Sequence, residues 1–150
     1  MELVVLAGGL GTRLRSIVSK VPKPMAPVKN IPFLQYLLDF WISNGITRII
    51  LSVSYKANII KNYFGNFYNG IPIRYCYEET PLGTGGALLK ASEMIMADRF
   101  FAINGDTFFK VDVKELLKLH QKKNSKLSLC LFETFEDKRY KIIKLNKSGK

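Results

Sequence analysis

The sequence has few of the side chains that most often serve as catalytic nucleophiles, bases or metal ligands. Two cysteines and one histidine occur among its 150 residues. Cys76 and Cys130 lie in apolar, strand-like stretches, with no further Cys or His at ligand spacing. We therefore expect two buried, reduced thiols and neither a disulfide nor a zinc site. His120 falls on the apolar side of a predicted helix, which favours a partly buried, hydrogen-bonded histidine over a catalytic base.

Long apolar runs, low-complexity tracts and internal repeats are also absent. No apolar stretch approaches the roughly 20 residues that cross a membrane. The amino terminus carries Glu2 and no basic region, unlike a signal peptide. These absences predict a cytoplasmic protein without a membrane partner. Because 47% of the residues are apolar, we expect residues 1–150 to form a single domain with a real core.

Acidic side chains are scarce relative to basic ones: 12 Asp and Glu stand against 23 Lys and Arg, for a net charge of +11. The region from Lys110 to Lys150 holds eleven lysines and one arginine against five acids. Polyanions would suit such a charge, but the sequence shows neither arginine-rich clusters with interleaved aromatics nor a nucleic-acid-binding motif. A solvated lysine-rich surface is the favoured interpretation, with nucleic acid as a minor alternative.

Apolar periodicity predicts strands that alternate with helices, the pattern of an open α/β sheet. The expected strands cover residues 2–7, 46–53, 71–77, 100–103, 126–132 and 140–145, and the expected helices cover 32–44, 57–64, 112–122 and the stretch with its apolar face from 87 to 95. A turn signal at 146–149 implies a returning strand, so we expect the sequence to lack the last part of its domain.

The first predicted strand runs directly into Gly8, Gly9 and Gly11, which are followed by Arg13. Glycines let successive backbone N–H groups turn toward one anion, and Arg13 adds a planar cation. Lys23 stands between two prolines, which stiffen the backbone that carries its ammonium group. Because strands of open α/β sheets end at a ligand-binding crevice, this segment predicts a phosphate site. A flexible glycine turn with solvated cations is the alternative.

Two familiar glycine motifs do not fit this segment. A P-loop needs glycine five residues after Gly8 and then Lys-Ser/Thr, but Arg13 stands at that position. A dinucleotide-binding fingerprint that begins with Gly9 and Gly11 needs a third glycine where Leu14 stands. A P-loop NTPase is therefore excluded, and a Rossmann dehydrogenase is disfavoured.

Two later segments are expected to reach the same crevice. Residues 81–86, Pro-Leu-Gly-Thr-Gly-Gly, lead into a predicted helix, and a helix amino terminus favours anions. Residues 104–107, Asn-Gly-Asp-Thr, follow a short buried strand, where Asp106 is well placed to hold Mg²⁺ against a triphosphate. A simple Asn-Gly turn with a solvated Asp106 is the alternative. The two glycine-rich segments nearby favour the metal.

The ordered motifs resemble those of the sugar-1-phosphate nucleotidyltransferases over essentially the whole chain. They are Leu6 to Arg15, Pro22 to Met25, Glu79 to Ala87 and Asn104 to Thr107. Within that family the second glycine segment and the Asn-Gly-Asp-Thr run are most similar to guanylyltransferases that act on heptose or mannose 1-phosphate. The resemblance implies an α/β class fold: the three-layer α/β/α, Rossmann-like nucleotide-diphospho-sugar transferase fold with a mostly parallel mixed central sheet.

The resemblance also implies a reaction and residue roles. A sugar-1-phosphate oxygen attacks the α-phosphorus of a nucleoside triphosphate, which releases pyrophosphate. Arg13, Lys23 and Asp106 would be catalytic: Arg13 stabilises the triphosphate, Lys23 contacts the transferred phosphate, and Asp106 binds Mg²⁺, the expected cofactor. The nucleotide-binding residues would be Leu6, Ala7, Gly8, Gly9, Gly11, Thr12, Arg13, Lys23, Glu78, Pro81, Gly83 and Thr84. Residues 78–84 would meet the base and ribose, and a homo-oligomer stays open.

Departures from the family pattern leave other interpretations open. The second metal carboxylate and most of the sugar pocket would lie beyond Lys150, so residues 1–150 are expected to be the nucleotide-binding portion without the C-terminal sugar-binding part. Lys141 also stands where similar enzymes usually carry glycine. The alternatives are thymidylyl or uridylyl transfer, a non-catalytic nucleotide-binding domain or fragment, and a nucleotide-sugar-dependent glycosyltransferase. The last is disfavoured because Asp106 has no second acid in an Asp-x-Asp pair.

Overall fold

The computed structural model describes residues 1–9, 21–133 and 143. It divides into two compact units, Met1–Lys110 and Val111–Lys150. The first unit contains a five-stranded sheet and the helices that cover it, and the second contains one described helix. The expected strand at 140–145 lies outside the described residues except for Ile143, which is exposed.

The sheet of the first unit is mostly parallel. Its order is β5-β6-β4-β1-β7, and only the short edge strand β5 runs antiparallel to its neighbour. The strands are β1 (Glu2–Leu6), β4 (Arg48–Val53), β5 (Phe67–Tyr68), β6 (Ile71–Tyr77) and β7 (Phe100–Asn104). Four of them follow the predicted strands, β6 with the same bounds and the other three with ends that differ by one or two residues, and β5 is an addition.

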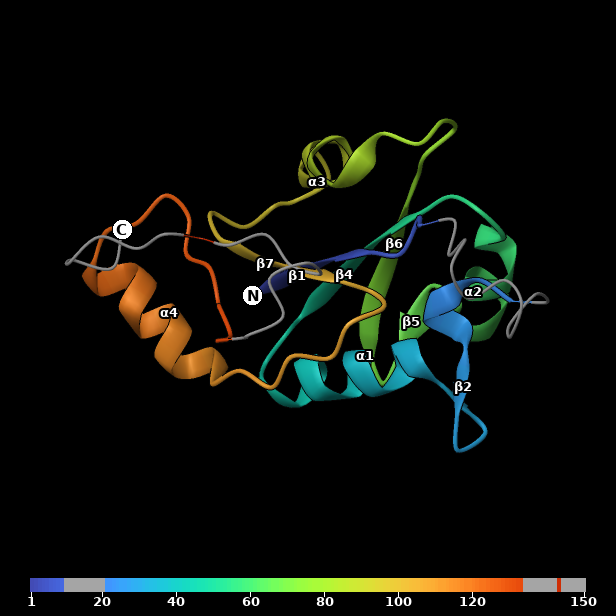
Figure 1. The fold of residues 1–150 in the computed structure, drawn as a ribbon, viewed down its shortest axis with the longest axis horizontal. Helices are drawn as coiled ribbons and strands as arrows, with labels where there is room; N and C mark the ends of the chain where they lie inside the picture. Colours follow the sequence, from blue (N-terminus) through green and yellow to red (C-terminus); the bar gives the residue numbers. More distant parts are fainter. Residues whose placement is uncertain (10–20, 134–142, 144–150) are drawn as a thin grey trace. The chain divides into compact units, whose positions relative to one another are not determined.

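Helices cover both faces of this sheet. In Figure 1, α1 (Phe33–Ser43) and α3 (Gly83–Ser92) lie on opposite sides of the strands. A third helix, α2 (Ala57–Phe64), packs on β6 and has the predicted bounds. This arrangement confirms the predicted three-layer α/β/α class with a mostly parallel mixed sheet.

The strand register explains which side chains form each half of the core. Leu3 aligns with Ile49 on one side and with Phe101 on the other, and the ring of Trp41 from α1 lies 5.0 Å from that of Phe101. Side chains one residue along point to the opposite face, where Val4, Ile50, Cys76 and Ala91 of α3 form a buried cluster. Cys76 is therefore a buried, free thiol as expected, and burial raises its pKa.

The strand order creates a switch point beside β1. The chain adds β4 and then β6 on one side of β1, and places β7 on the other side. In open α/β sheets, ligands usually bind at the carboxyl ends of the strands beside such a switch point. The first glycine-rich segment follows β1, and Asp106 follows β7.

A small hairpin, absent from the sequence predictions, follows the Lys23 segment. β2 (Pro27–Val28) pairs antiparallel with β3 (Ile31–Pro32). Lys29 and Asn30 form the turn with φ of 49° and 65°, the left-handed pair that a two-residue hairpin turn requires. The hairpin then leads directly into α1.

The second unit corrects two expectations. Its helix α4 (Val113–Lys122) begins after Asp112, whose side chain caps it by accepting from the N–H of Glu115 at 3.0 Å. The strand predicted at 126–132 is wrong, since these residues form no strand. Alternating apolar residues make a strand only where a neighbouring strand supplies hydrogen bonds, and no described strand pairs with this segment. Cys130 is consequently exposed rather than buried, although it is free as expected.

His120 of α4 is partly buried, and its Nδ1 lies 2.9 Å from the Ser128 hydroxyl. The expectation of a hydrogen-bonded structural histidine is confirmed.

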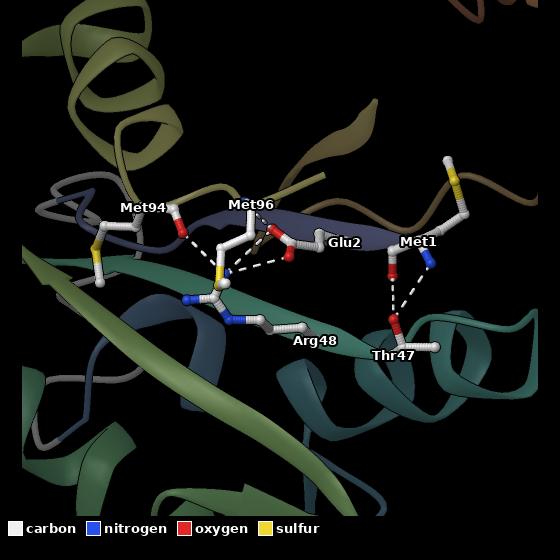
Figure 2. Close-up of polar contacts among 6 residues, drawn as sticks. All are labelled: Met1, Glu2, Thr47, Arg48, Met94 and Met96. Carbon is white, nitrogen blue, oxygen red and sulfur yellow. Dashed lines mark hydrogen bonds and ion pairs between the residues drawn. The ribbon is translucent and has the colours of Figure 1, made fainter. Parts of the chain in front are cut away.

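A buried polar cluster ties the amino-terminal ends of the central strands to the segment after α3. Figure 2 shows Glu2 of β1 and Arg48 of β4 side by side, with the Arg48 Nη1 donating to both Glu2 oxygens at 3.2 and 3.3 Å. The same nitrogen donates to the Met94 carbonyl at 2.9 Å, and the N–H of Met96 donates to Glu2 Oε2 at 3.0 Å. Only 7% of Glu2 is exposed, so this carboxylate depends on these donors.

We predict that Arg48→Ala destabilises the first unit by about 2–3 kcal/mol, because it leaves the buried Glu2 carboxylate without its cation. Arg74→Ala is the matched control, since Arg74 is exposed on β6 and its loss should change the free energy of unfolding by less than about 0.5 kcal/mol. Urea unfolding followed by circular dichroism measures both. Equal stability losses in the two variants would show that the cluster contributes nothing specific.

Candidate functional site

Sheet hydrogen bonds continue past the end of β1 on both of its sides. The N–H of Ala7 donates to the carbonyl of Ser52, and the N–H of Gly105 donates to the carbonyl of Leu6, both at 2.8 Å. The start of the first glycine segment is thus held between β4 and the residues that follow β7. This fixes three segments, far apart in sequence, at the carboxyl edge of the sheet.

Gly105 allows the chain that leaves β7 to pass close to the end of β1. A Cβ added there would lie 3.1 Å from the Leu6 carbonyl oxygen and 3.2 Å from the Ala7 Cβ. Any larger residue would push the β7 exit away from β1. Sequence reasoning gave Gly105 no role of its own. Its position between a buried strand and Asp106 could have indicated this role.

Lys23 and Asp106 meet at this edge. Their ammonium and carboxylate groups, Nζ and Oδ2, are 2.5 Å apart, and the side chains are 35% and 36% exposed. Lys23 begins the short 3₁₀ helix η2 (Lys23–Met25), which the buried Pro24 and Met25 anchor in the protein. The Thr107 hydroxyl donates to the other Asp106 oxygen at 3.1 Å. The structure therefore brings together two of the three residues expected to be catalytic, with opposite charges in contact.

Glu78 lies on the other side of the first glycine segment. Its side chain follows β6 and is buried, with 9% exposed. The Ser52 hydroxyl donates to Oε1 at 2.8 Å, and the N–H of Leu82 lies 3.4 Å from Oε2. A Cβ on Gly8 would lie 2.5 Å from Oε1, so the carboxylate packs directly against the Gly8 backbone. The sequence analysis named Glu78 and Gly8 but missed Ser52. The only indication of Ser52 in the sequence is that it is a polar residue within an apolar strand.

The second glycine segment is part of a helix rather than a free loop. α3 begins at Gly83, whose φ is +69°. At Gly86 a Cβ would lie only 2.9 Å from the Leu82 Cβ. The absence of a side chain at Gly86 therefore allows Leu82 to pack against the start of α3. Pro81, Gly83 and Thr84 are all exposed. Because Leu82 contacts the Glu78 carboxylate, the amino terminus of α3 lies next to that residue.

The structure describes some of the other predicted site residues and not the rest. Leu6, Ala7, Gly8 and Gly9 are at the end of β1 and just beyond it, with Ala7 buried and Gly9 exposed. Gly11, Thr12 and Arg13 lie outside the described residues, so their placement stays a prediction. Within residues 1–9, 21–133 and 143, no three His, Cys, Asp or Glu side chains group as a metal site. The described helices include none long and apolar enough to cross a membrane.

Comparison with known proteins agrees with this geometry. Residues 2–150 match the Nucleotidyl transferase family. The chain is 49% identical over 140 residues to a D-glycero-alpha-D-manno-heptose 1-phosphate guanylyltransferase of Aneurinibacillus thermoaerophilus, covering 93% of this chain and 61% of that protein. It is 42% identical over 146 residues to the enzyme of the same name from Campylobacter jejuni, covering 97% of this chain and 64% of that protein.

Solved structures show the same relationship. HddC from Yersinia pseudotuberculosis, solved alone and complexed with GMP-PN, is 42% identical and superposes with a TM-score of 0.71, covering 79% of this chain and 53% of that one. UTP-bound UGPase from Acinetobacter baumannii, at 21% identity, shares the fold with a TM-score of 0.73, covering 83% of this chain and 53% of that one.

This chain spans 61% and 64% of the length of the two heptose 1-phosphate guanylyltransferases. The match to the family nevertheless runs from the first strand to the last residue. With a mostly parallel sheet, a glycine segment that begins where its strand β1 ends, and the Lys23–Asp106 pair at the same edge, the chain belongs to the nucleotidyl transferase family.

Proposed function

We propose that the protein transfers a guanylyl group from GTP to a sugar 1-phosphate, forming a nucleotide sugar and pyrophosphate. D-glycero-D-manno-heptose 1-phosphate is the first candidate acceptor and mannose 1-phosphate the second. The names of the relatives support this choice: two are heptose 1-phosphate guanylyltransferases, and one from Mycobacterium tuberculosis, 38% identical over 132 residues, is a mannose-1-phosphate guanylyltransferase.

The observation that carries the choice of base is the buried Glu78 carboxylate beside Gly8. A carboxylate only accepts hydrogen bonds, and it can accept two in parallel. Guanine offers two adjacent donors, its N1–H and its 2-amino group. Adenine and cytosine place an acceptor at the ring nitrogen of that edge, and uracil and thymine offer one donor between two carbonyls. An acceptor-only side chain in this position therefore favours guanine.

The chemistry that the site must perform suits its residues. The attacking group is a phosphate oxyanion, so no general base is needed and catalysis can depend on alignment and charge neutralisation. The Lys23 ammonium can turn from Asp106 to the phosphates of a bound nucleotide, and Arg13 is expected to add a second cation. When bound, Mg²⁺ would neutralise the charge of the triphosphate.

Asp106 fits a magnesium site of this kind. Mg²⁺ at phosphate-transfer sites is held by one or two carboxylates, with substrate oxygens and waters completing its shell. Asp106 is exposed at the carboxyl edge of the sheet, and in this structure its carboxylate already attracts a cation, the Lys23 ammonium. We therefore propose Asp106 as the Mg²⁺ ligand.

Turnover tests the proposed reaction. We expect the full-length protein, given Mg²⁺ and D-glycero-D-manno-heptose 1-phosphate or mannose 1-phosphate, to release pyrophosphate rapidly with GTP and far more slowly with UTP, dTTP, CTP or ATP. A coupled pyrophosphate assay over this panel measures the preference. Rapid release with UTP or dTTP in place of GTP would contradict guanylyl transfer while leaving the family assignment intact.

Glu78→Gln should abolish the preference for guanine. The amide replaces one acceptor by a donor, so we expect GTP binding to weaken about 10- to 100-fold, the loss of a hydrogen bond to a charged group. ATP binding should change little. Glu79→Gln is the matched control, since Glu79 is adjacent and exposed. Calorimetric titration with both nucleotides measures the effect, and an unchanged GTP/ATP ratio in Glu78→Gln would reject the role of this carboxylate.

Lys23→Gln should separate two effects of the Lys23 ammonium: its competition with a metal ion for Asp106 and its stabilisation of the phosphates. Because the ammonium no longer competes for Asp106, Mn²⁺ binding without nucleotide should strengthen about two- to fivefold, the scale of a partly exposed ion pair. Turnover should fall about 100-fold or more, because a cation is lost from the phosphates.

Electron paramagnetic resonance of Mn²⁺ and the pyrophosphate assay give the two readouts. Lys29→Gln, in the exposed β2–β3 turn, serves as the control and should alter neither. Weaker Mn²⁺ binding in Lys23→Gln would show that Lys23 does not compete at Asp106.

A further inference from the structure

Ser52 is a polar residue in the most deeply buried part of the sheet. Its neighbours in β4, from Ile49 to Leu51 and then Val53, are apolar and fully buried, and Ser52 itself is 0% exposed. Burying a hydroxyl costs free energy unless it is hydrogen-bonded. An apolar residue would suit the strand better. The stability of β4 therefore does not account for a serine here.

The hydroxyl instead serves the Glu78 carboxylate. It donates to Oε1 at 2.8 Å, while the Leu82 N–H approaches Oε2 from the start of α3. Held at both oxygens, the carboxyl group has a fixed plane against the Gly8 backbone. Ser52 and Leu82 use two of about four lone-pair directions of a carboxylate. Each oxygen thus retains capacity for one more donor.

We propose that Ser52 is a positioning residue for guanine recognition: its hydroxyl fixes the plane of the Glu78 carboxylate so that both oxygens meet the N1–H and 2-amino donors together. This inference rests on the proposed function, because it assumes that Glu78 reads the base. Without the hydroxyl, the carboxylate turns about its last side-chain bond and keeps one hydrogen bond to the base at most.

Inosine triphosphate is the probe that isolates this effect. Hypoxanthine keeps the N1–H of guanine and lacks the 2-amino group. In the protein with Ser52, GTP should therefore bind more tightly than ITP. In Ser52→Ala, the ratio of the ITP dissociation constant to the GTP dissociation constant should shrink about tenfold toward unity. The affinity for ITP should change much less. Calorimetric titration of the protein with both nucleotides gives the ratio.

A merely structural serine predicts a different result. Ser52→Ala would then weaken GTP and ITP equally, together with a lower melting temperature, and leave their ratio unchanged. That outcome overturns the proposal. Ser43→Ala is the matched control, because it also removes a hydroxyl bonded at 2.8 Å, in this case to the Phe40 carbonyl of α1. It should leave the ratio as in the unchanged protein.

A second pair of variants tests the same role if Ser52→Ala folds poorly. Ser52→Thr and Ser52→Val have the same shape, suit a strand equally and differ only in the hydroxyl. The threonine variant should keep the GTP preference over ITP, and the valine variant should lose it. Equal ratios in these two variants overturn the role of the hydroxyl.

The same titrations separate this inference from the proposed function. If the unchanged protein does not prefer GTP to ITP, or keeps its preference in Glu78→Gln, the base-reading role of Glu78 fails and the positioning role of Ser52 fails with it. If Glu78→Gln removes the preference and Ser52→Ala and Ser52→Val retain it, guanine reading by Glu78 stands and only the role of Ser52 is rejected.

Discussion

The site depends on one steric constraint, the close passage of the chain as it leaves β1 between two neighbours. On one side Gly105 brings its backbone to within hydrogen-bonding distance of Leu6, and on the other Gly8 lies against the Glu78 carboxylate. Both contacts exist because these residues lack a Cβ. A methyl group at Gly8 would displace the Glu78 carboxylate, and one at Gly105 would press on the Leu6 carbonyl and shift the segment that carries Asp106.

The charged side chains on the two sides of this passage differ in how firmly they are held. Glu78 is buried, so its hydrogen bonds act in a medium of low effective dielectric and its orientation is strongly determined. Lys23 and Asp106 are about one-third exposed, so water screens their attraction and the pair can separate at little cost. A rigid group suits discrimination between bases, whereas an exchangeable pair suits a step in which phosphates and a metal must enter.

The sequence predicted the sheet well, since parallel strands buried on both faces are continuous apolar runs flanked by turns. It predicted α2 and β6 to the residue, and it placed Lys23, Glu78 and Asp106 at one edge, because strand ends and motifs coincide there. It could not predict Ser52, whose partner is 26 positions away, or the contact of Gly105 with Leu6. It also misassigned residues 126–132, because alternation specifies a strand's faces but not the neighbour that must pair with it.

The two edges of the sheet carry polar groups of different kinds. At the amino-terminal edge, Glu2 and Arg48 pair with each other and with backbone groups after α3, so their hydrogen bonds are satisfied within the protein. At the carboxyl edge, Glu78 retains acceptor capacity, and Asp106 is paired with a lysine that can turn to another anion. The pairing of β1 with β4 runs from Glu2 and Arg48 at one edge to Leu6 and Ser52 at the other, and the bond from the Ala7 N–H to the Ser52 carbonyl extends it toward Gly8. One continuous strand pair thus carries a closed polar cluster at its amino edge and, at its carboxyl edge, the serine that contacts Glu78.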